Sequence, residues 1–156
     1  MSVSTHRSRC CQLTGSQWAI FDLGDHPVPT YYKGRVCILG DAAHASSPHH
    51  GAGAGFAVED CAFLSELLAD GRVKSLRDLE AVFATFDAHR RPRTQWSVQS
   101  SRRCADLYEW RAEGVGRDLK KIEQEVNERT AVVWYVDVRK MVDEAKEELA
   151  TRLSWI

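Results

Sequence analysis

The alternation of hydrophobic and polar positions predicts one short apolar strand followed by helices. The segment Val36–Leu39 is apolar throughout, which is typical of a strand buried in an α/β layer. A second short strand is expected over Gln17–Phe21, before a loop marked by glycine and proline. Between Gly55 and Ala69, apolar residues recur at helical spacing, so this range is predicted to be a helix.

The remainder of the chain predicts helices. Ser75 is expected to start one, because Asp78 stands three residues later in the position of a capping-box acid. Pro92 has no backbone N–H, so it is expected to interrupt or kink this helix, and a second helical stretch is expected over about 93–113. Beyond Arg117 the pattern is again helical and heavily charged. The predicted fold class is α+β and mostly helical, with a short strand pair followed by helices.

Composition limits the class of protein. The 156 residues are enough for one domain with a core, and 44% hydrophobic and 28% charged residues are ordinary for a soluble globular protein. The net charge of -1 favours no nucleic-acid partner, and no apolar run approaches the roughly 20 residues of a membrane span. Cysteines without a Cys-x-x-Cys pair favour a reducing, cytoplasmic location. We expect a disordered start over 1–16 and a single domain over 17–156.

The stretch from Gly40 to Asp60 carries the most informative pattern. Asp41 directly follows the apolar strand, and small, turn-forming residues lead from it into a helix. A carboxylate here can accept hydrogen bonds from the hydroxyls of a sugar chain, and small residues let the backbone approach a ring closely. The start of the helix offers free N–H donors and the positive end of its dipole. This arrangement suits a polar, partly anionic cofactor.

These residues closely resemble the second flavin-binding motif of the FAD-dependent aromatic hydroxylases, the salicylate-hydroxylase-like group A flavoprotein monooxygenases. The matching elements are Gly40-Asp41-Ala42-Ala43-His44, Pro48, Gly51-Ala52-Gly53-Ala54-Gly55 and Glu59-Asp60. The resemblance implies that 17–156 is a partial domain, the C-terminal fragment of an FAD/NAD(P)-binding α/β domain. It also implies FAD as cofactor, NAD(P)H as reductant and the O2-dependent hydroxylation of a small aromatic substrate.

The resemblance also assigns roles to residues of this chain. Asp41 would accept from the ribityl chain of FAD, with His44 packed beside that chain. Pro48, Gly51, Ala52 and Gly53 would lie along the isoalloxazine ring, where backbone N–H groups stabilise negative charge on its pyrimidine edge. The full set expected to bind the cofactor is Gly40, Asp41, Ala42, His44, Pro48, Gly51, Ala52 and Gly53.

His49 and His50 would lie near the ring and the substrate, as acid–base groups that titrate near neutral pH. Glutamine is the commoner family residue where His50 stands, so the family's substrate does not carry over. The spacing of His44, His49 and His50 lacks the helical pair and the carboxylate or thiolate of a metal site, so no metal is expected. The basic run 89–93 resembles a segment that packs behind the flavin domain, and a solvated basic face is the alternative.

The ADP-binding fingerprint of the family is missing from this sequence. The run Gly51–Phe56 has phenylalanine where the third glycine of Gly-x-Gly-x-x-Gly belongs, and no strand precedes it. We therefore expect this chain to supply only the isoalloxazine and ribityl half-site, with a complementary chain supplying the ADP half. One alternative is a flavin-free isomerase or cyclase that uses His49 and His50 on a polyketide-like or aromatic substrate. The other is a non-catalytic truncated product or an interaction module, which could form a homodimer through the exposed strand.

Overall fold

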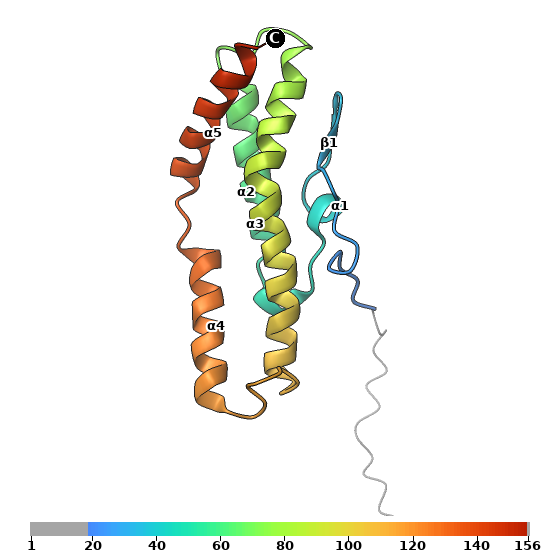
Figure 1. The fold of residues 1–156 in the computed structure, drawn as a ribbon, viewed down its shortest axis with the longest axis vertical. Helices are drawn as coiled ribbons and strands as arrows, with labels where there is room; N and C mark the ends of the chain where they lie inside the picture. The colour runs from blue at the N-terminus through green and yellow to red at the C-terminus, as the bar shows by residue number, and fades with distance from the viewer. Residues whose placement is uncertain (1–18, 156) are drawn as a thin grey trace, which may run out of the picture.

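A computed structural model describes residues 19–155 (Figure 1). The elements follow in the order β1 (Tyr32–Lys33), β2 (Val36–Cys37), α1 (Asp41–His44), the 3-10 turn η1 (Pro48–His50), α2 (Gly53–Leu68), α3 (Asp78–Tyr108), α4 (Leu119–Trp134) and α5 (Val138–Leu153). This confirms the predicted class, a mostly helical α+β fold with a short strand pair. The expected disordered start at 1–16 lies outside the described residues.

Helix α3 is the scaffold of the molecule. It runs along the whole length of the helical bundle, with α2 and α5 packed on its upper part and α4 beside its lower part (Figure 1). The strand pair and α1 lie on the other side of α3 from α4 and α5. Among residues 19–155, no helix combines the length and the apolar character needed to cross a bilayer.

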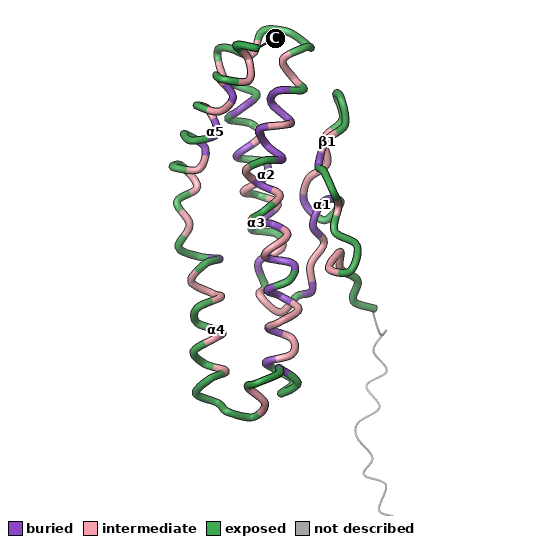
Figure 2. Tube along the Cα trace, viewed as in Figure 1, coloured by how far each residue is buried: buried purple, intermediate pink, exposed green. Residues whose placement is uncertain are grey.

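The main core lies where α2, α3 and α5 meet, in the upper part of the bundle (Figure 2). Apolar residues at helical spacing supply it, as the sequence pattern predicts, and its fully buried members include Phe63, Leu67, Val82, Phe86 and Leu149. A second, smaller cluster of Ala52, Phe56 and Val133 joins the start of α2 to the end of α4. The first turn of α2 is therefore packed against the end of α4.

The strand predictions are correct only in part. Residues 19–21 form no strand, and the side chains of Ile20 and Phe21 are 62% and 83% exposed. The apolar run Val36–Leu39 pairs only over Val36–Cys37, in a hairpin that places Lys33 opposite Val36. Its two-residue turn contains Gly34 at a φ of 55°, and such turns favour glycine. The rest of the run packs against the helical core, so the helices cover it.

Helix α3 continues through Pro92, so the predicted interruption is wrong. Arg90 and Thr94, on either side of Pro92, are completely buried, and packing on several sides outweighs the loss of one helical hydrogen bond. The start of α3 is Asp78 rather than Ser75. The carboxylate of Asp78 nevertheless accepts from the N–H of Ser75 at 2.8 Å, as expected for the acid of a capping box.

Candidate functional site

A cavity of about 540 Å³ opens beside the N-terminus of α2. It is lined by Asp41, Ser46, Ser47, Pro48, Gly51, Ala52, Gly53, Ala54 and Ala57. The structure thus brings together Asp41, Pro48, Gly51, Ala52 and Gly53 from the set predicted to bind the cofactor. We refer to this space as the α2 cavity.

The carboxylate of Asp41 lies at the edge of the α2 cavity. Asp41 is exposed and is the first residue of α1, whose N-cap is Gly40. It therefore does not cap the helix, and its side chain makes no hydrogen bond to any residue in the described range. The carboxylate is free to accept hydrogen bonds from a ligand.

The start of α2 presents free backbone donors on the same cavity. The first hydrogen bond of this 16-residue helix runs from the N–H of Phe56 to the carbonyl oxygen of Ala52, at 3.0 Å. The N–H groups of Gly53, Ala54 and Gly55 find no acceptor in the described part of the chain. Free amides and the positive end of the helix dipole make this position favourable for an acceptor-rich or negatively charged group.

Glycine keeps the surface of the α2 cavity open. A Cβ atom added at Gly51 would meet no atom within 4 Å, and one at Gly53 would meet only Ser46 Oγ at 3.7 Å. A flat ring can therefore approach the backbone here. A carboxylate acceptor, free amide donors and an open face match the hydroxyls, the pyrimidine edge and the plane of a flavin. The residues present fit that group.

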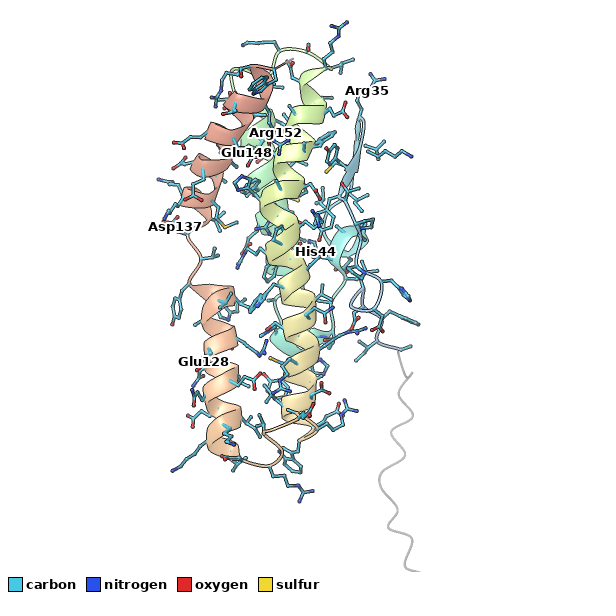
Figure 3. All side chains as sticks on the ribbon, viewed as in Figure 1. Arg35, His44, Glu128, Asp137, Glu148 and Arg152 are labelled. Carbon is cyan, nitrogen blue, oxygen red and sulfur yellow. The ribbon has the colours of Figure 1, made fainter. Side chains whose placement is uncertain are left out.

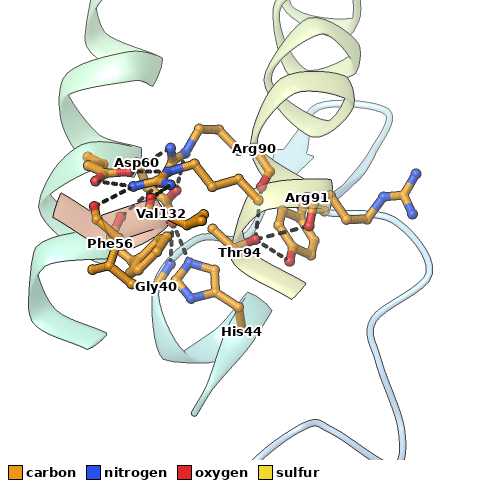
Figure 4. Close-up of polar contacts among 12 residues, drawn as sticks. Gly40, His44, Phe56, Asp60, Arg90, Arg91, Thr94 and Val132 are labelled. Carbon is orange, nitrogen blue, oxygen red and sulfur yellow. Dashed lines mark hydrogen bonds and ion pairs between the residues drawn. The ribbon is translucent and has the colours of Figure 1, made fainter. Parts of the chain in front are cut away.

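Gly40 and His44 do not line the α2 cavity, and both contact Asp60 instead (Figure 4). The N–H of Gly40 donates to Oδ2 of Asp60 at 3.0 Å, and Nε2 of His44 lies 2.6 Å from the same oxygen. His44, the last residue of α1, is only 4% exposed (labelled in Figure 3). Ala42 is exposed but does not line the cavity either. Contact between these three residues and the cofactor stays a prediction.

Part of the basic run 89–93 is buried, so it is not a solvated face. Arg90 is completely buried, and its Nε donates to Asp60 at 2.7 Å while its Nη1 donates to Glu59 at 2.8 Å. Arg93 donates to both carboxylate oxygens of Glu59 and lies over the ring of Phe56, 4.7 Å from its centroid. Burial would raise the pKa of Glu59, but the hydrogen bonds and charges of Arg93 and Arg90 outweigh it and lower the pKa.

His49 and His50 do not line the α2 cavity, although both belong to the turn that borders it. His49 Nδ1 lies 3.0 Å from Ser47 Oγ. His50 Nε2 lies 2.9 Å from Ser100 Oγ, and its ring stacks on Trp96. Burial, followed by the charge of Arg129, lowers the pKa of His50 below its ordinary value. Within residues 19–155, no group of His, Cys, Asp and Glu side chains is arranged to hold a metal ion.

Sequence reasoning missed the serines of α3 that hold this turn. Ser101 donates from its Oγ to the carbonyl oxygen of Ser47 at 2.6 Å, and Ser100 contacts His50. Both serines are 1% exposed. Their signal is a set of small polar residues at helical spacing, Ser97, Ser100 and Ser101, in a helix whose neighbouring turns carry longer polar and charged side chains.

Gly40 should not tolerate a side chain. Its φ of 59° and ψ of -144° belong to a region that residues with a Cβ rarely adopt, and an added Cβ would lie 3.4 Å from Cβ of Ala57. Gly40→Ala should lower the free energy of unfolding in urea by about 1–3 kcal/mol. Gly71→Ala is the control, because a Cβ there meets nothing within 4 Å and the glycine has no positive φ. Equal stability of the two variants would contradict this reading.

The geometry of the α2 cavity is compatible with a flavin cofactor. A comparison with known families agrees: the family described as FAD binding domain matches residues 5–101, more than half of the sequence, so this chain belongs to the FAD-binding domain family. The predicted relationship to the salicylate-hydroxylase-like flavoprotein monooxygenases is confirmed by the relatives below.

Relatives among characterised proteins are flavoprotein monooxygenases. The chain is 48% identical over 147 residues to the FAD-dependent monooxygenase pigN of Monascus ruber, covering 90% of this chain and 34% of that protein. It is 44% identical over 153 residues to the salicylate hydroxylase asL1 of Sarocladium schorii, covering 88% of this chain and 32% of that protein. A solved salicylate hydroxylase substrate complex matches with a TM-score of 0.72 and 39% identity, over 76% of this chain and 29% of that one. The chain thus spans about a third of the length of these relatives.

Proposed function

We propose that the α2 cavity holds the isoalloxazine ring and ribityl chain of FAD, and that this chain supplies that half-site of an FAD-dependent monooxygenase. One observation carries the proposal: a free carboxylate and a set of free helix-start amides face a single cavity next to an open glycine surface. When bound and reduced by NAD(P)H, FAD would supply the O2-dependent chemistry that hydroxylates an electron-rich ring.

The residues around the α2 cavity then have defined roles. Asp41 accepts hydrogen bonds from the ribityl hydroxyls. The N–H groups of Gly53 and Ala54 donate to the pyrimidine edge of the ring and stabilise negative charge there, as amides do in an oxyanion hole. Pro48 and Ala57 line the cavity with apolar atoms and exclude water from the ring.

The proposed substrate is a small aromatic compound, supported by the relatives that are named as salicylate hydroxylases. We assign acid–base work beside the ring to His49 and His50. His49 follows Pro48, which lines the α2 cavity, and only its Nδ1 is hydrogen-bonded to a described residue. His50, whose pKa is lowered by burial, is neutral at pH 7 and would act as an acceptor.

The proposal gives this chain the ring half of FAD only. This chain matches about a third of each relative, so the ADP half of the cofactor is assigned to the part of the enzyme that corresponds to the rest of those relatives. It follows that the ADP moiety should contribute little to binding by this chain. Riboflavin and FAD should bind with dissociation constants within a factor of about three, and excess ADP should not displace either.

Asp41→Ala should change the affinity for flavins with a ribityl chain and leave the affinity for the bare ring unchanged. Loss of hydrogen bonds to a charged acceptor should raise the dissociation constant of riboflavin about tenfold. Lumiflavin carries the same ring without a ribityl chain, so its affinity should not change. Both dissociation constants are measured by quenching of flavin fluorescence. Asp25→Ala is the control, because Asp25 pairs with Arg102 and does not line the cavity. An equal loss of affinity for both ligands, or no loss for either, would rule out the proposed role of Asp41.

A further inference from the structure

Asp60 has no part in the proposed chemistry, yet it joins three separate segments of the chain (Figure 4). Its side chain is completely buried in α2. Oδ2 accepts from the N–H of Gly40 at 3.0 Å and lies 2.6 Å from Nε2 of His44. Oδ1 accepts from Nε of Arg90, on α3, at 2.7 Å. A single carboxylate thus connects α1, α2 and α3.

These contacts hold α1 at both of its ends. Gly40 immediately precedes the helix and His44 is its last residue, and both meet the same oxygen of Asp60. The carbonyl oxygen of Gly40 in turn accepts from the N–H groups of Ala43 and His44, each at 2.9 Å. A four-residue helix is too short to be stable alone, so its position depends on these external contacts. Asp41 is the first residue of that helix.

The charge on Asp60 is fixed by its surroundings. Burial would raise the pKa of this carboxyl, but hydrogen bonds from His44, Gly40 and Arg90 outweigh burial and lower the pKa. Arg90 is also held by Glu59 and by the carbonyl oxygen of Phe56, at 3.3 Å. An ionised, fully hydrogen-bonded carboxylate is a rigid anchor, since moving it would leave a buried charge without a partner.

We propose that Asp60 is a positioning residue for flavin binding, which holds the carboxylate of Asp41 at the α2 cavity without touching the cofactor itself. This inference rests on the proposed function. Because Asp60 acts through α1, its loss should weaken the binding of flavins that carry a ribityl chain and should leave the binding of lumiflavin unchanged. A purely structural role would affect the two ligands alike.

The chain offers a matched control in Asp87. This carboxylate is 8% exposed, accepts from the distant N–H of Tyr31 at 2.8 Å and accepts from Nε of Arg91 at 3.1 Å. It is therefore the same kind of anchor, an aspartate that joins a helix to a loop backbone and an arginine, but it does not line the α2 cavity. Asp60→Asn and Asp87→Asn remove the same charge from comparable surroundings.

The test compares these two variants of the full chain with two measurements. The first is amide hydrogen exchange at Gly40, Ala43 and His44, which needs no ligand. The second is the pair of dissociation constants for riboflavin and lumiflavin. Asp60→Asn should speed exchange at these amides about tenfold or more and raise the riboflavin constant about tenfold, with the lumiflavin constant unchanged. Asp87→Asn should do neither.

A milder pair of variants covers the case in which Asp60→Asn fails to fold. His44→Gln retains an N–H donor for Asp60, whereas His44→Leu removes it. Glutamine should keep amide exchange at Gly40 and Ala43 near the wild-type rates, and leucine should raise these rates severalfold. Equal effects of Asp60→Asn and Asp87→Asn, or equal losses of riboflavin and lumiflavin, would overturn the inference. A wild-type chain that binds neither flavin would overturn the proposed function instead, and the exchange rates would still test whether Asp60 holds α1.

Discussion

Replacing Arg90 with methionine should lower the free energy of unfolding by about 3–5 kcal/mol, measured by urea denaturation at neutral pH. Methionine fills much of the same space, so the loss comes mainly from electrostatics. The substitution leaves Asp60 buried without a cation, while Glu59 keeps Arg93. Arg72→Ala is the control. It removes an exposed arginine that pairs with Asp70, two residues away, and donates to the carbonyl oxygen of Lys146 in an exposed contact, so the urea midpoint should move little.

The same variant should reverse the effect of pH on stability. In the wild-type chain the pKa of Asp60 lies below its ordinary value of 3.8, so its contribution is complete at neutral pH and is lost as the pH falls through the folded-state pKa. In Arg90→Met, burial without the cation should raise the pKa of Asp60. The variant should therefore recover part of its stability between about pH 7 and pH 5, where the wild-type contribution of Asp60 stays constant. A difference in unfolding free energy between the wild type and Arg90→Met that does not change with pH would contradict this account.

Arg93→Ala should cost about 3 kcal/mol of unfolding free energy, because this side chain joins three helices. It is paired to both oxygens of Glu59 on α2, and it donates to the carbonyl oxygens of Val132 and Val133 at the end of α4, at 3.0 and 3.2 Å. A cation at the C-terminus of a helix also stabilises its dipole. Val133 is the buried residue of α4, so this contact lies at the packed end of the helix, while Arg103 pairs with Glu125 farther along it.

Hydrogen exchange locates the effect of Arg93→Ala. Amides of α4 should exchange at least tenfold faster than in the wild type, while those of α5, which packs on the main core, should change much less. Arg93→Lys keeps the charge but lacks the planar fork that meets Glu59, so it should rescue only a small part of the loss. Uniform acceleration across all helices, or full rescue by lysine, would show that Arg93 does not hold α4 specifically.

The flavin motif could be predicted from sequence because its signals are local. Asp41 after an apolar run, glycine at 51 and 53 and the apolar period that starts α2 are all set by neighbours along the chain. The structure brings Asp41 and these glycines to one cavity. The helical spacing of Phe63 and Leu67 likewise gave one face of the core correctly.

The contacts behind the motif could not be predicted, because they depend on packing between distant segments. His44 meets Asp60 across 16 residues, and Arg90 meets Asp60 across 30. Nothing in the local pattern shows that the basic run faces inward. Pro92 is a similar case, since local chemistry disfavours a helix there while the buried neighbours Arg90 and Thr94 maintain it. The apolar run Val36–Leu39 also fits either a buried strand or the arm of a hairpin, which periodicity alone does not separate.

The most direct test of the flavin half-site is a titration of the 15N-labelled chain with riboflavin, followed by the amide chemical shifts. Our account predicts that the largest changes fall on Asp41 and on the residues of the helix start, Gly51–Gly55. A second cavity, of about 490 Å³ between α3 and α4 and lined by Trp96 and Arg129, serves as the internal comparison. Shifts that cluster there, or a spectrum that riboflavin leaves unchanged, would contradict the assignment of the α2 cavity to the flavin ring.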